Sequence, residues 1–488
     1  MDLQNTTLTQ LRQLLDSKSI SAAELTDAYL ERIRAVDGSL LSYITVTPEE
    51  AHAQAEQAQA RIDAGNAAPL TGIPMAMKDN LCTDGVRTTC SSRMLEDFVP
   101  PYDATVVEKL KAQNYIMLGK ASMDEFAMGS SNQTSAFAKT RNPYDTSCVP
   151  GGSSGGSAAA VSAGLCAAAL GSDTGGSIRQ PASFCGVTGL KPTYGRVSRY
   201  GLVAFASSLD QIGPIARCAR DCGTVLSAIA GQDPHDATSA PQSVPDFNEK
   251  VGKSLKGLKI ALPKEFFGDA VDDEVKEAVL AAARAYQSMG AELVDCSIST
   301  LKYAVAAYYL IASAEAASNL ARFDGIKYGL RGEGNSFDKM IRDSRSRGFG
   351  DEVKRRILLG NYALSSGYYD AYYRKALALK QDFIKEYDRI FQTADIILTP
   401  TAPTVAYPIG KQEHDPVKMY TGDICTVTVN IACLPAISTT CGYSRTGMPI
   451  GMSLIGRRFD EATIIQAADA FEQGFTVIPA KPEGGAAK

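Results

Sequence analysis

Glycine, serine and alanine fill 21 of the 27 positions between Gly151 and Ser177, and no other stretch constrains the fold of this 488-residue chain as strongly. The stretch reads GGSSGGSAAAVSAGLCAAALGSDTGGS, with Asp173 as its one charged residue. Small residues let backbone segments and a ligand approach one another closely, and glycine adopts dihedral angles that other residues rarely reach. We therefore expect a tightly packed segment whose backbone can cradle a ligand.

Serine is frequent in this stretch, which holds six, whereas histidine is rare in the whole chain, which holds three. The histidines His52, His235 and His414 stand far apart, so motifs that place histidines at fixed offsets around a metal are missing from the sequence. We expect no metal in this chain. A catalytic serine in the stretch would need activation by a group other than histidine.

The composition favours a reduced, cytosolic globular protein. Hydrophobic residues make up 45% of the chain, enough for one large core or for two to three domains. The formal net charge of −5 argues against a chain that grips a phosphate backbone by itself. The 11 cysteines are scattered without a CxxC pair, and no apolar run of about 20 residues predicts a membrane-spanning helix.

Predicted helices and strands alternate along the chain, which indicates an α/β fold with a substantial sheet. Ser21 and Glu24 form a capping box that begins a helix, and Asp103 is expected to cap a helix that ends near Gln113. Further helices are expected over 48–63, 156–164, 271–289, most of 303–390, and 459–473. Strands are expected within 72–78 and over Tyr115–Leu118, 165–171, Leu258–Leu262, Glu292–Cys296, Ala394–Leu398 and Gly447–Ile455.

One interpretation of the first serines is the nucleophile elbow GxSxG of α/β-hydrolases, which Gly151-Gly-Ser153-Ser-Gly155 fits literally. The elbow also needs a later aspartate and then a histidine. Only His235 and His414 lie downstream, both in loop-like contexts, and a segment so rich in glycine and serine matches a short pattern easily. A P-loop is excluded, because the segment has no lysine before Lys191.

Lys78 offers another way to activate a serine. It ends the apolar segment Pro74-Met-Ala-Met-Lys78 and is followed by Asp79. One interpretation is an exposed lysine that pairs with Asp79, and the other is a buried lysine whose amine is neutral. Burial can lower the pKa of a lysine by about 3 units or more, at a cost of about 4 kcal/mol, and the second interpretation makes Lys78 a base.

Two separated segments resemble the amidase signature nearly position for position: Gly151-Gly-Ser153-Ser-Gly-Gly-Ser-Ala-Ala and Asp173-Thr-Gly-Gly-Ser177-Ile-Arg179-Gln-Pro181-Ala. Lys78 lies where that family carries its lysine, and the resemblance runs over most of the chain. It implies an α/β fold with a large mixed central sheet covered by helices on both faces, in three layers. It also implies a single amidase domain over 1–488, with N-terminal helices over about 1–65, a catalytic core over about 66–300 and 391–478, a helical excursion over about 303–390 and a mobile tail over 479–488.

The resemblance further implies a Ser-Ser-Lys triad of Ser177, Ser153 and Lys78. Ser177 would attack an amide carbon, and Ser153, placed on an unusual cis peptide bond, would pass the proton to neutral Lys78. The oxyanion hole would consist of the backbone N–H groups of Thr174, Gly175, Gly176 and Ser177, because glycines let consecutive donors point to one spot. We expect Arg179 to pair with Asp173 and so to hold this loop.

Three further segments resemble the A subunits of the glutamyl-tRNA(Gln)/aspartyl-tRNA(Asn) amidotransferases: Lys191–Pro214, Arg322–Gly329 and Glu352–Gly360. This resemblance implies glutamine as the amide donor, and B and C subunits as partners in a cytoplasmic heterotrimer. ATP and Mg²⁺ would bind at the partner subunit, which would also make most of the contacts with tRNA. This chain would hold no cofactor and would supply ammonia through an internal passage.

The same resemblance assigns the contacts with glutamine. Asp423, in Tyr420-Thr-Gly-Asp423, would bind the α-amino group, and Arg356 would bind the carboxylate. Arg355 is an alternative to Arg356, since adjacent residues of a helix do not both face one pocket. Tyr308 would close the pocket or serve as a core tyrosine. A free-standing amidase that acts on small or aryl amides is the alternative function, because it would share the triad.

Overall fold

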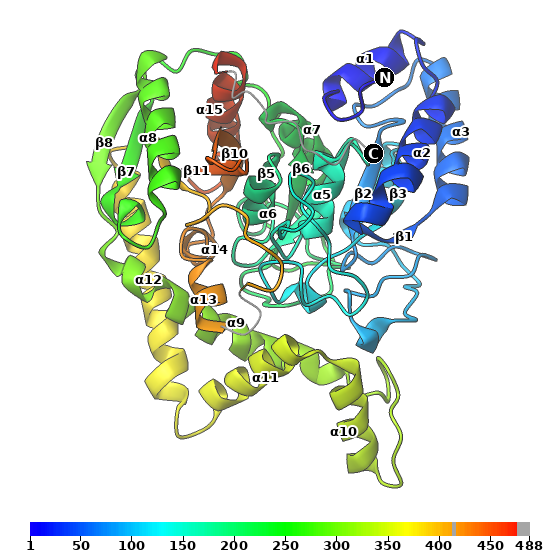
Figure 1. Ribbon diagram of the computed structural model, residues 1–488, viewed down its shortest axis with the longest axis vertical. Helices are drawn as coiled ribbons and strands as arrows, with labels where there is room; N and C mark the ends of the chain where they lie inside the picture. The colour runs from blue at the N-terminus through cyan, green and yellow to red at the C-terminus, as the bar shows by residue number, and fades with distance from the viewer. Residues whose placement is uncertain (412–415, 476–488) are drawn as a thin grey trace.

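One mixed sheet of eleven strands runs through the part of the chain that the structure describes (Figure 1). The structure, a computed structural model, describes residues 1–411 and 416–475, so the tail predicted over 479–488 and His414 lie outside the described residues. The strands are β1 (Tyr43–Val46), β2 (Pro74–Lys78), β3 (Ile116–Ala121), β4 (Ala168–Asp173), β5 (Thr188–Lys191), β6 (Gln211–Ala216), β7 (Lys259–Pro263), β8 (Glu292–Cys296), β9 (Ile396–Pro400), β10 (Ala436–Tyr443) and β11 (Pro449–Gly456).

The sheet has the strand order β1-β3-β2-β4-β6-β5-β10-β11-β9-β7-β8. β2 is parallel to both of its neighbours, β3 and β4, and β7 is parallel to β9 and β8. From β4 to β9 each strand is antiparallel to the next one in this order. The large mixed sheet confirms the predicted α/β fold.

Helices cover both faces of the sheet, as the direction of alternate residues in β11 demonstrates. Residues separated by an odd number of positions point to opposite faces of a strand. A Cβ atom on Gly451 would meet Ser183, whereas one on Gly456 would meet Ile464. Ser183 belongs to helix α6 (Arg179–Phe184) and Ile464 to helix α15 (Glu461–Gly474), so these two helices lie on opposite faces and the fold has three layers.

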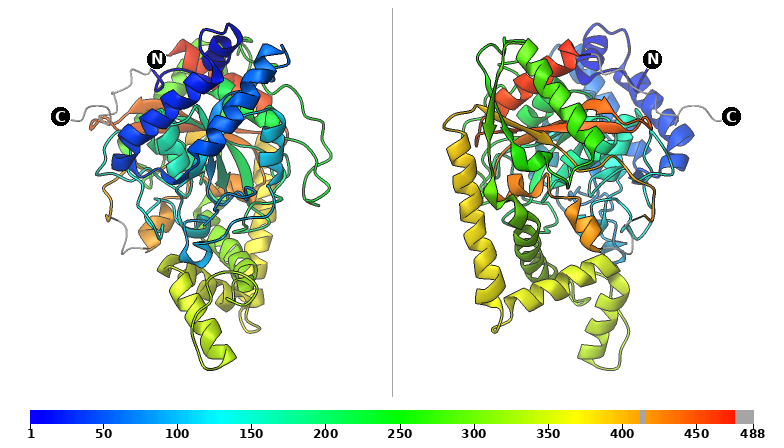
Figure 2. Two further views of the ribbon diagram at one scale, coloured as in Figure 1. Left: turned by 90° about the vertical axis from the view of Figure 1, so that its right-hand side faces the viewer. Right: turned by 60° about the vertical axis from the view of Figure 1, so that its left-hand side comes forward.

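The other helices lie around the sheet and along the chain between the strands (Figures 1 and 2). They are α1 (Leu8–Asp16), α2 (Ala22–Leu40), α3 (Pro48–Asp63), α4 (Thr105–Ala112), α5 (Gly155–Ser162), α7 (Ala219–Ile229), α8 (Asp273–Ser288), α9 (Ala304–Asn319), α10 (Phe337–Gly348), α11 (Asp351–Leu364), α12 (Arg374–Ile390), α13 (Pro416–Thr421) and α14 (Val427–Ile431). Within the described ranges, none of the helices combines the length and the apolar content needed to cross a membrane.

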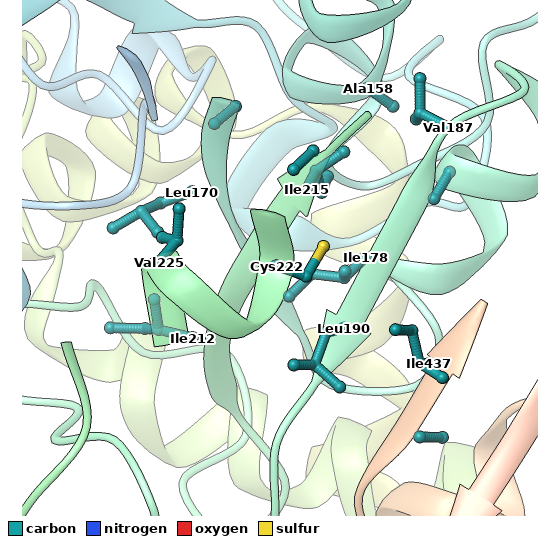
Figure 3. Close-up of a cluster of buried hydrophobic side chains, with 14 of the residues drawn as sticks. Ala158, Leu170, Ile178, Val187, Leu190, Ile212, Ile215, Cys222, Val225 and Ile437 are labelled. Atoms are coloured by element: carbon teal, nitrogen blue, oxygen red, sulfur yellow. The ribbon is translucent and has the colours of Figure 1, made fainter. Parts of the chain in front are cut away.

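Apolar side chains join the middle of the sheet to α5 and α7 (Figure 3). Leu170 of β4 and Ile212 of β6 lie next to Val225 of α7. Ile215 of β6 pairs with Ala169 and points to the opposite face of the sheet. All of these residues are buried, and so is every residue of α5. The small residues of α5 let this helix pack closely on β4, as the composition of the 151–177 stretch predicts.

Most of the predicted elements are present, and their boundaries differ by a few residues. The capping box at Ser21 and the helix over 48–63 are confirmed. The strand expected over 165–171 begins later, at Ala168. Asp103 does not cap α4, because its carboxylate accepts from Asp84 N–H and pairs with Lys111 instead. Strands β1, β5, β6 and β10 were not predicted, since they are short or buried and show no clear alternation.

Helices α9 to α12 form the predicted helical excursion, which extends from the sheet to one end of the molecule, with α10 at its tip (Figures 1 and 2). α9 and α11 pack very closely where Gly360 of α11 faces the backbone of Ser313 in α9. A methyl group on Gly360 would overlap the carbonyl oxygen of Ser313. Glycine at this position therefore sets the distance between the two helices that carry Tyr308, Tyr309 and Arg356.

We predict that Gly360→Ala destabilises the protein, although alanine is intrinsically more favourable than glycine in a helix interior by about 1 kcal/mol. Overpacking of this kind typically costs about 1–3 kcal/mol, because backbone or side chains must shift. Urea unfolding measures the change in the free energy of unfolding. Gly367→Ala is the matched control, since a Cβ atom there meets no other described atom within 4 Å. A Gly360→Ala variant as stable as the control would contradict this packing.

Candidate active site

Lys78 lies at the carboxyl end of β2 and is fully buried. Its Nζ atom lies 2.7 Å from Ser153 Oγ, 2.8 Å from Ser154 Oγ and 3.2 Å from the carbonyl oxygen of Ser172. The interpretation of Lys78 as an exposed partner of Asp79 is wrong, because Asp79 is also buried and pairs with a different lysine, Lys120, at 3.8 Å. The fold thus brings Lys78 and Ser153 into hydrogen-bonding contact from positions 75 residues apart.

The surroundings of Lys78 favour a neutral amine. Burial lowers the pKa of Lys78 to about 7, although the carboxylates of Asp124 and Asp173 act in the opposite direction. Near pH 7 a substantial fraction of the amine is therefore neutral and able to accept a proton. This is the state that a lysine base requires.

The turn that carries Ser153 is held in place by its backbone. The peptide bond between Gly152 and Ser153 is cis, as the family resemblance implies. Gly152 N–H donates to Gln180 Oε1 at 2.9 Å. Ser154 N–H donates to the carbonyl oxygen of Ser177 at 3.1 Å, and this bond joins the turn of Ser153 to the turn of Ser177.

Asp173 organises the turn that carries Ser177. Its two carboxylate oxygens accept from Arg179 Nε at 3.0 Å and from Arg179 Nη2 at 3.1 Å, and both side chains are fully buried. The same carboxylate accepts from Gly176 N–H at 2.8 Å and from Ile178 N–H at 3.2 Å. Burial alone would raise the pKa of Asp173, but the Arg179 guanidinium, together with Lys191 and Asn430, holds that pKa below its ordinary value. The predicted pair of Arg179 and Asp173 is confirmed.

One of the four predicted oxyanion donors is already engaged. Because Gly176 N–H is bound to the Asp173 carboxylate, the prediction is wrong for Gly176 in this structure. The backbone N–H groups of Thr174, Gly175 and Ser177 stay candidate donors. Thr174 is held in position through its hydroxyl group, which donates to the carboxylate of Asp210 at 2.7 Å.

Tyr308 lies against the same turn. A Cβ atom on Gly175 would be 2.5 Å from the Tyr308 hydroxyl oxygen, so only glycine leaves room for this ring. Tyr308 is buried and packs edge-on against Tyr309, with ring centroids 5.0 Å apart. Tyr308 therefore belongs to the core and also borders the turn of Ser177, and its closing of a pocket stays a prediction.

Tyr309, which no sequence motif indicated, links Asp423 to Arg356. Its hydroxyl donates to Asp423 Oδ2 at 2.7 Å. The Arg356 guanidinium lies 4.4 Å from the centroid of the Tyr309 ring and 4.8 Å from that of Tyr420. Burial raises the pKa of Asp423 to about 7, while the Tyr309 hydroxyl and Arg356 act in the opposite direction. The carboxyl group of Asp423 and the guanidinium of Arg356 thus both contact the side chain of Tyr309.

The two adjacent arginines of α11 have different environments. Arg356 is fully buried, and its Nε atom lies 2.6 Å from Glu352 Oε1. The side chain of Arg355 is 45% exposed and pairs with the other oxygen of Glu352. Of the two candidates, Arg356 is therefore the one that packs beside Tyr309 and Asp423.

Several residues of the site were missed in the sequence. Ser154 and Gln180 lie inside the recognised segments, so their proximity to Ser153 and Arg179 could have indicated them. The others come from distant elements that only the fold brings together: Asp124, Tyr309, Glu352 and Tyr420. Within residues 1–411 and 416–475, no group of three or more His, Cys, Asp or Glu side chains is placed to hold a metal ion.

A family model described as amidase matches residues 24–465. The chain belongs to the amidase family. The predicted resemblance to the amidase signature is thereby confirmed, and it rests on residues 24–465 as well as on the two segments around Ser153 and Ser177.

Full-length relatives of this amidase share one name within the family. It is 56% identical to the A subunit of glutamyl-tRNA(Gln) amidotransferase from Moorella thermoacetica, over 100% of both chains. It is 55% identical to the protein of the same name from Geobacter metallireducens, over 97% of this chain and 98% of that protein. These full-length relatives agree with the narrower resemblance found in the sequence.

Solved structures of related proteins share the fold. The A subunit of glutamyl-tRNA(Gln) amidotransferase from Thermotoga maritima superimposes with a TM-score of 0.83 at 41% identity, covering 100% of this chain and 99% of that one. A peptide amidase from Stenotrophomonas maltophilia superimposes with a TM-score of 0.83 at 28% identity, covering 99% of this chain and 100% of that one. The same architecture therefore occurs in amidases with different names.

We predict that Asp173→Asn destabilises this amidase by about 3–5 kcal/mol, because the substitution leaves the buried Arg179 without a charged partner. Urea unfolding at neutral pH measures this loss. Asp16→Asn is the matched control, since Asp16 is 57% exposed where it pairs with Arg12, and exposed pairs contribute about 1 kcal/mol or less. Equal effects of the two substitutions would show that the buried pair does not stabilise the fold.

Proposed function

We propose that this amidase is the glutamine-hydrolysing subunit of a tRNA-dependent amidotransferase, which supplies ammonia for the conversion of Glu-tRNA(Gln), Asp-tRNA(Asn) or both. The observation that carries the proposal is the arrangement of Asp423 and Arg356 on either side of Tyr309, close to the turn of Ser177. A carboxylate and a guanidinium match the α-ammonium and the α-carboxylate of glutamine. A neutral amide offers neither charge. The names of the full-length relatives support the same assignment.

In the proposed reaction, Ser177 Oγ attacks the side-chain amide carbon of glutamine. The Ser177 proton passes to Ser153, and the Ser153 proton passes to neutral Lys78, whose Nζ atom lies 2.7 Å from Ser153 Oγ. The backbone N–H groups of Thr174, Gly175 and Ser177 stabilise the negative oxygen of the tetrahedral intermediate. Collapse of this intermediate breaks the C–N bond, and Lys78 returns the proton through Ser153 to the leaving ammonia.

The second half of the reaction restores the enzyme. Water adds to the acyl-enzyme, its proton passes by way of Ser153 to Lys78, and the C–O bond to Ser177 breaks as glutamate forms. Ser177 then regains its proton. The hydrogen bond from Ser154 N–H to the Ser177 carbonyl supports this scheme, because it keeps the two serine turns together throughout both halves.

The proposal includes partner proteins. A B subunit would bind ATP and Mg²⁺, activate the misacylated tRNA and make most of the tRNA contacts, and a C subunit would complete a cytoplasmic heterotrimer. Ammonia would travel to the B subunit through an internal passage. The net charge of −5 supports the placement of most tRNA contacts outside this chain.

The decisive experiment is co-purification with the native partners, followed by a test for glutamine-dependent amidation of Glu-tRNA(Gln) and Asp-tRNA(Asn) in the presence of ATP. Ser177→Ala should abolish amidation driven by glutamine and leave amidation driven by added ammonia, because the partner would still activate the tRNA. Ser39→Ala, an exposed serine far from the site in sequence, is the control. A chain that is monomeric and fully active on small or aryl amides would favour the free-standing amidase instead.

We predict that kcat/KM for glutamine falls steeply below pH 7, because Lys78 must be neutral to accept a proton and Asp423 must be ionised to bind the ammonium group. Burial places the pKa of each group at about 7, so the slope of log kcat/KM against pH should approach about two on the acid side. In kcat the bound ammonium keeps Asp423 ionised, and the slope should approach about one.

Initial rates from about pH 5.5 to about 8.5 would measure both profiles. Asp423→Asn removes one of the two titrating groups and should reduce the slope of log kcat/KM from about two to about one. Profiles that stay flat on the acid side in the wild-type enzyme would exclude a neutral Lys78 as the base.

A further inference from the structure

We propose that Glu352 is a positioning residue, which orients the guanidinium of Arg356 toward the carboxylate of the substrate. The inference rests on the proposed role of Arg356 in binding glutamine. Glu352 lies in the first turn of α11, one helical turn before Arg356, and is buried. Its function does not require contact with the substrate, since it would act through the arginine.

The hydrogen bonds of Glu352 fix one edge of Arg356. Glu352 Oε1 accepts from Arg356 Nε at 2.6 Å and from the Tyr420 hydroxyl at 2.9 Å. Because the pair uses Nε, the terminal nitrogens Nη1 and Nη2 are not part of it. A substrate carboxylate can bind two guanidinium N–H groups at once, and the terminal edge offers such a pair of donors.

Aromatic rings restrain the guanidinium in the remaining directions. Its central carbon lies 4.4 Å from the centroid of Tyr309 and 4.8 Å from that of Tyr420. Since Tyr420 also donates to Glu352, the carboxylate orients both the arginine and one of the rings beside it. An arginine side chain has several rotatable bonds, so these contacts remove conformational freedom before the substrate binds.

The cluster of Glu352, Arg355 and Arg356 carries a net positive charge, which attracts the substrate carboxylate. Glu352 Oε2 pairs with Arg355, so one carboxylate is shared by two guanidinium groups. A pair of Glu352 and Arg356 alone would be neutral and would attract a substrate carboxylate only weakly. The exposed Arg355 restores one positive charge to the cluster and keeps Glu352 from neutralising Arg356 completely.

The test uses Glu352→Gln in the amidase assembled with its co-purified partners. The glutamine side chain is nearly isosteric but carries no charge, so it loosens Arg356 without removing it. We expect KM for glutamine to rise about tenfold, as for a loss of about 1.4 kcal/mol, while kcat changes by less than about twofold. Lys354→Gln is the matched control on the same helix, because Lys354 pairs with the exposed Asp351 at 3.7 Å, and its KM should equal that of the wild type.

Two further variants separate this inference from the proposed function. If Arg356→Gln leaves KM for glutamine unchanged, the proposed role of Arg356 is wrong. If Arg356→Gln raises KM and Glu352→Gln does not, the role of Arg356 stands and the positioning role of Glu352 is overturned. Should Glu352→Gln fail to fold, Tyr420→Phe removes one hydrogen bond to Glu352 and keeps the ring, and it should raise KM about threefold without lowering the melting temperature. An unchanged KM in Tyr420→Phe would then count against the inference.

Discussion

The buried ion pair between Asp173 and Arg179 is the interaction on which the rest of the site depends. Two charges removed from water are stable only when each is fully paired and hydrogen-bonded. Arg179 meets this requirement by reaching to Asn430 Oδ1 at 2.6 Å, and Asn430 donates in turn to Asp173 at 2.8 Å. The pair therefore joins the turn after β4 to α14, although more than 240 residues separate the two segments. The turn of Ser177 is thus fixed before any substrate arrives.

Burial in the fold favours the neutral amine of Lys78, a side chain that is normally charged. The change in its pKa from 10.5 to about 7 corresponds to roughly 5 kcal/mol by which the protein disfavours the charged amine. The sign follows from proton binding: between the two pKa values the unfolded chain holds the proton and the folded chain does not, so stability rises with pH across this range. The penalty is present in full below pH 7. The neutral state of Lys78 is therefore maintained by the packing energy of the surrounding core.

The sequence predicted the parts of the site that lie close together in the chain. Ser153 and Ser177 belong to one stretch whose composition is unusual, Arg179 follows it by two residues, and the segments that hold all three match a family signature. Lys78 needed the family resemblance, because a single lysine after an apolar segment is compatible with either burial or exposure. Tyr309 and Glu352 escaped prediction, since they lie on two helices whose contact depends on tertiary packing. The engagement of Gly176 N–H by Asp173 was missed for a related reason, because donor direction depends on dihedral angles that residue types do not specify.

The residues proposed for bond cleavage and those proposed for recognition of glutamine lie in two different regions of the fold. The residues proposed for bond cleavage lie on the sheet and on the turns that flank α5 and β4. A backbone hydrogen bond joins the two turns, and the pair of Asp173 and Arg179 holds the turn of Ser177. The residues proposed to recognise glutamine lie on α9, on α11 and after α13, outside the central strands. Since the peptide amidase shares the whole architecture at 28% identity, the sheet by itself does not select the substrate. Selection by charge requires a buried carboxylate and a buried guanidinium held close together without neutralising each other. Tyr309 meets that requirement, because its hydroxyl binds Asp423 while its ring, stacked on Tyr420, lies beside Arg356.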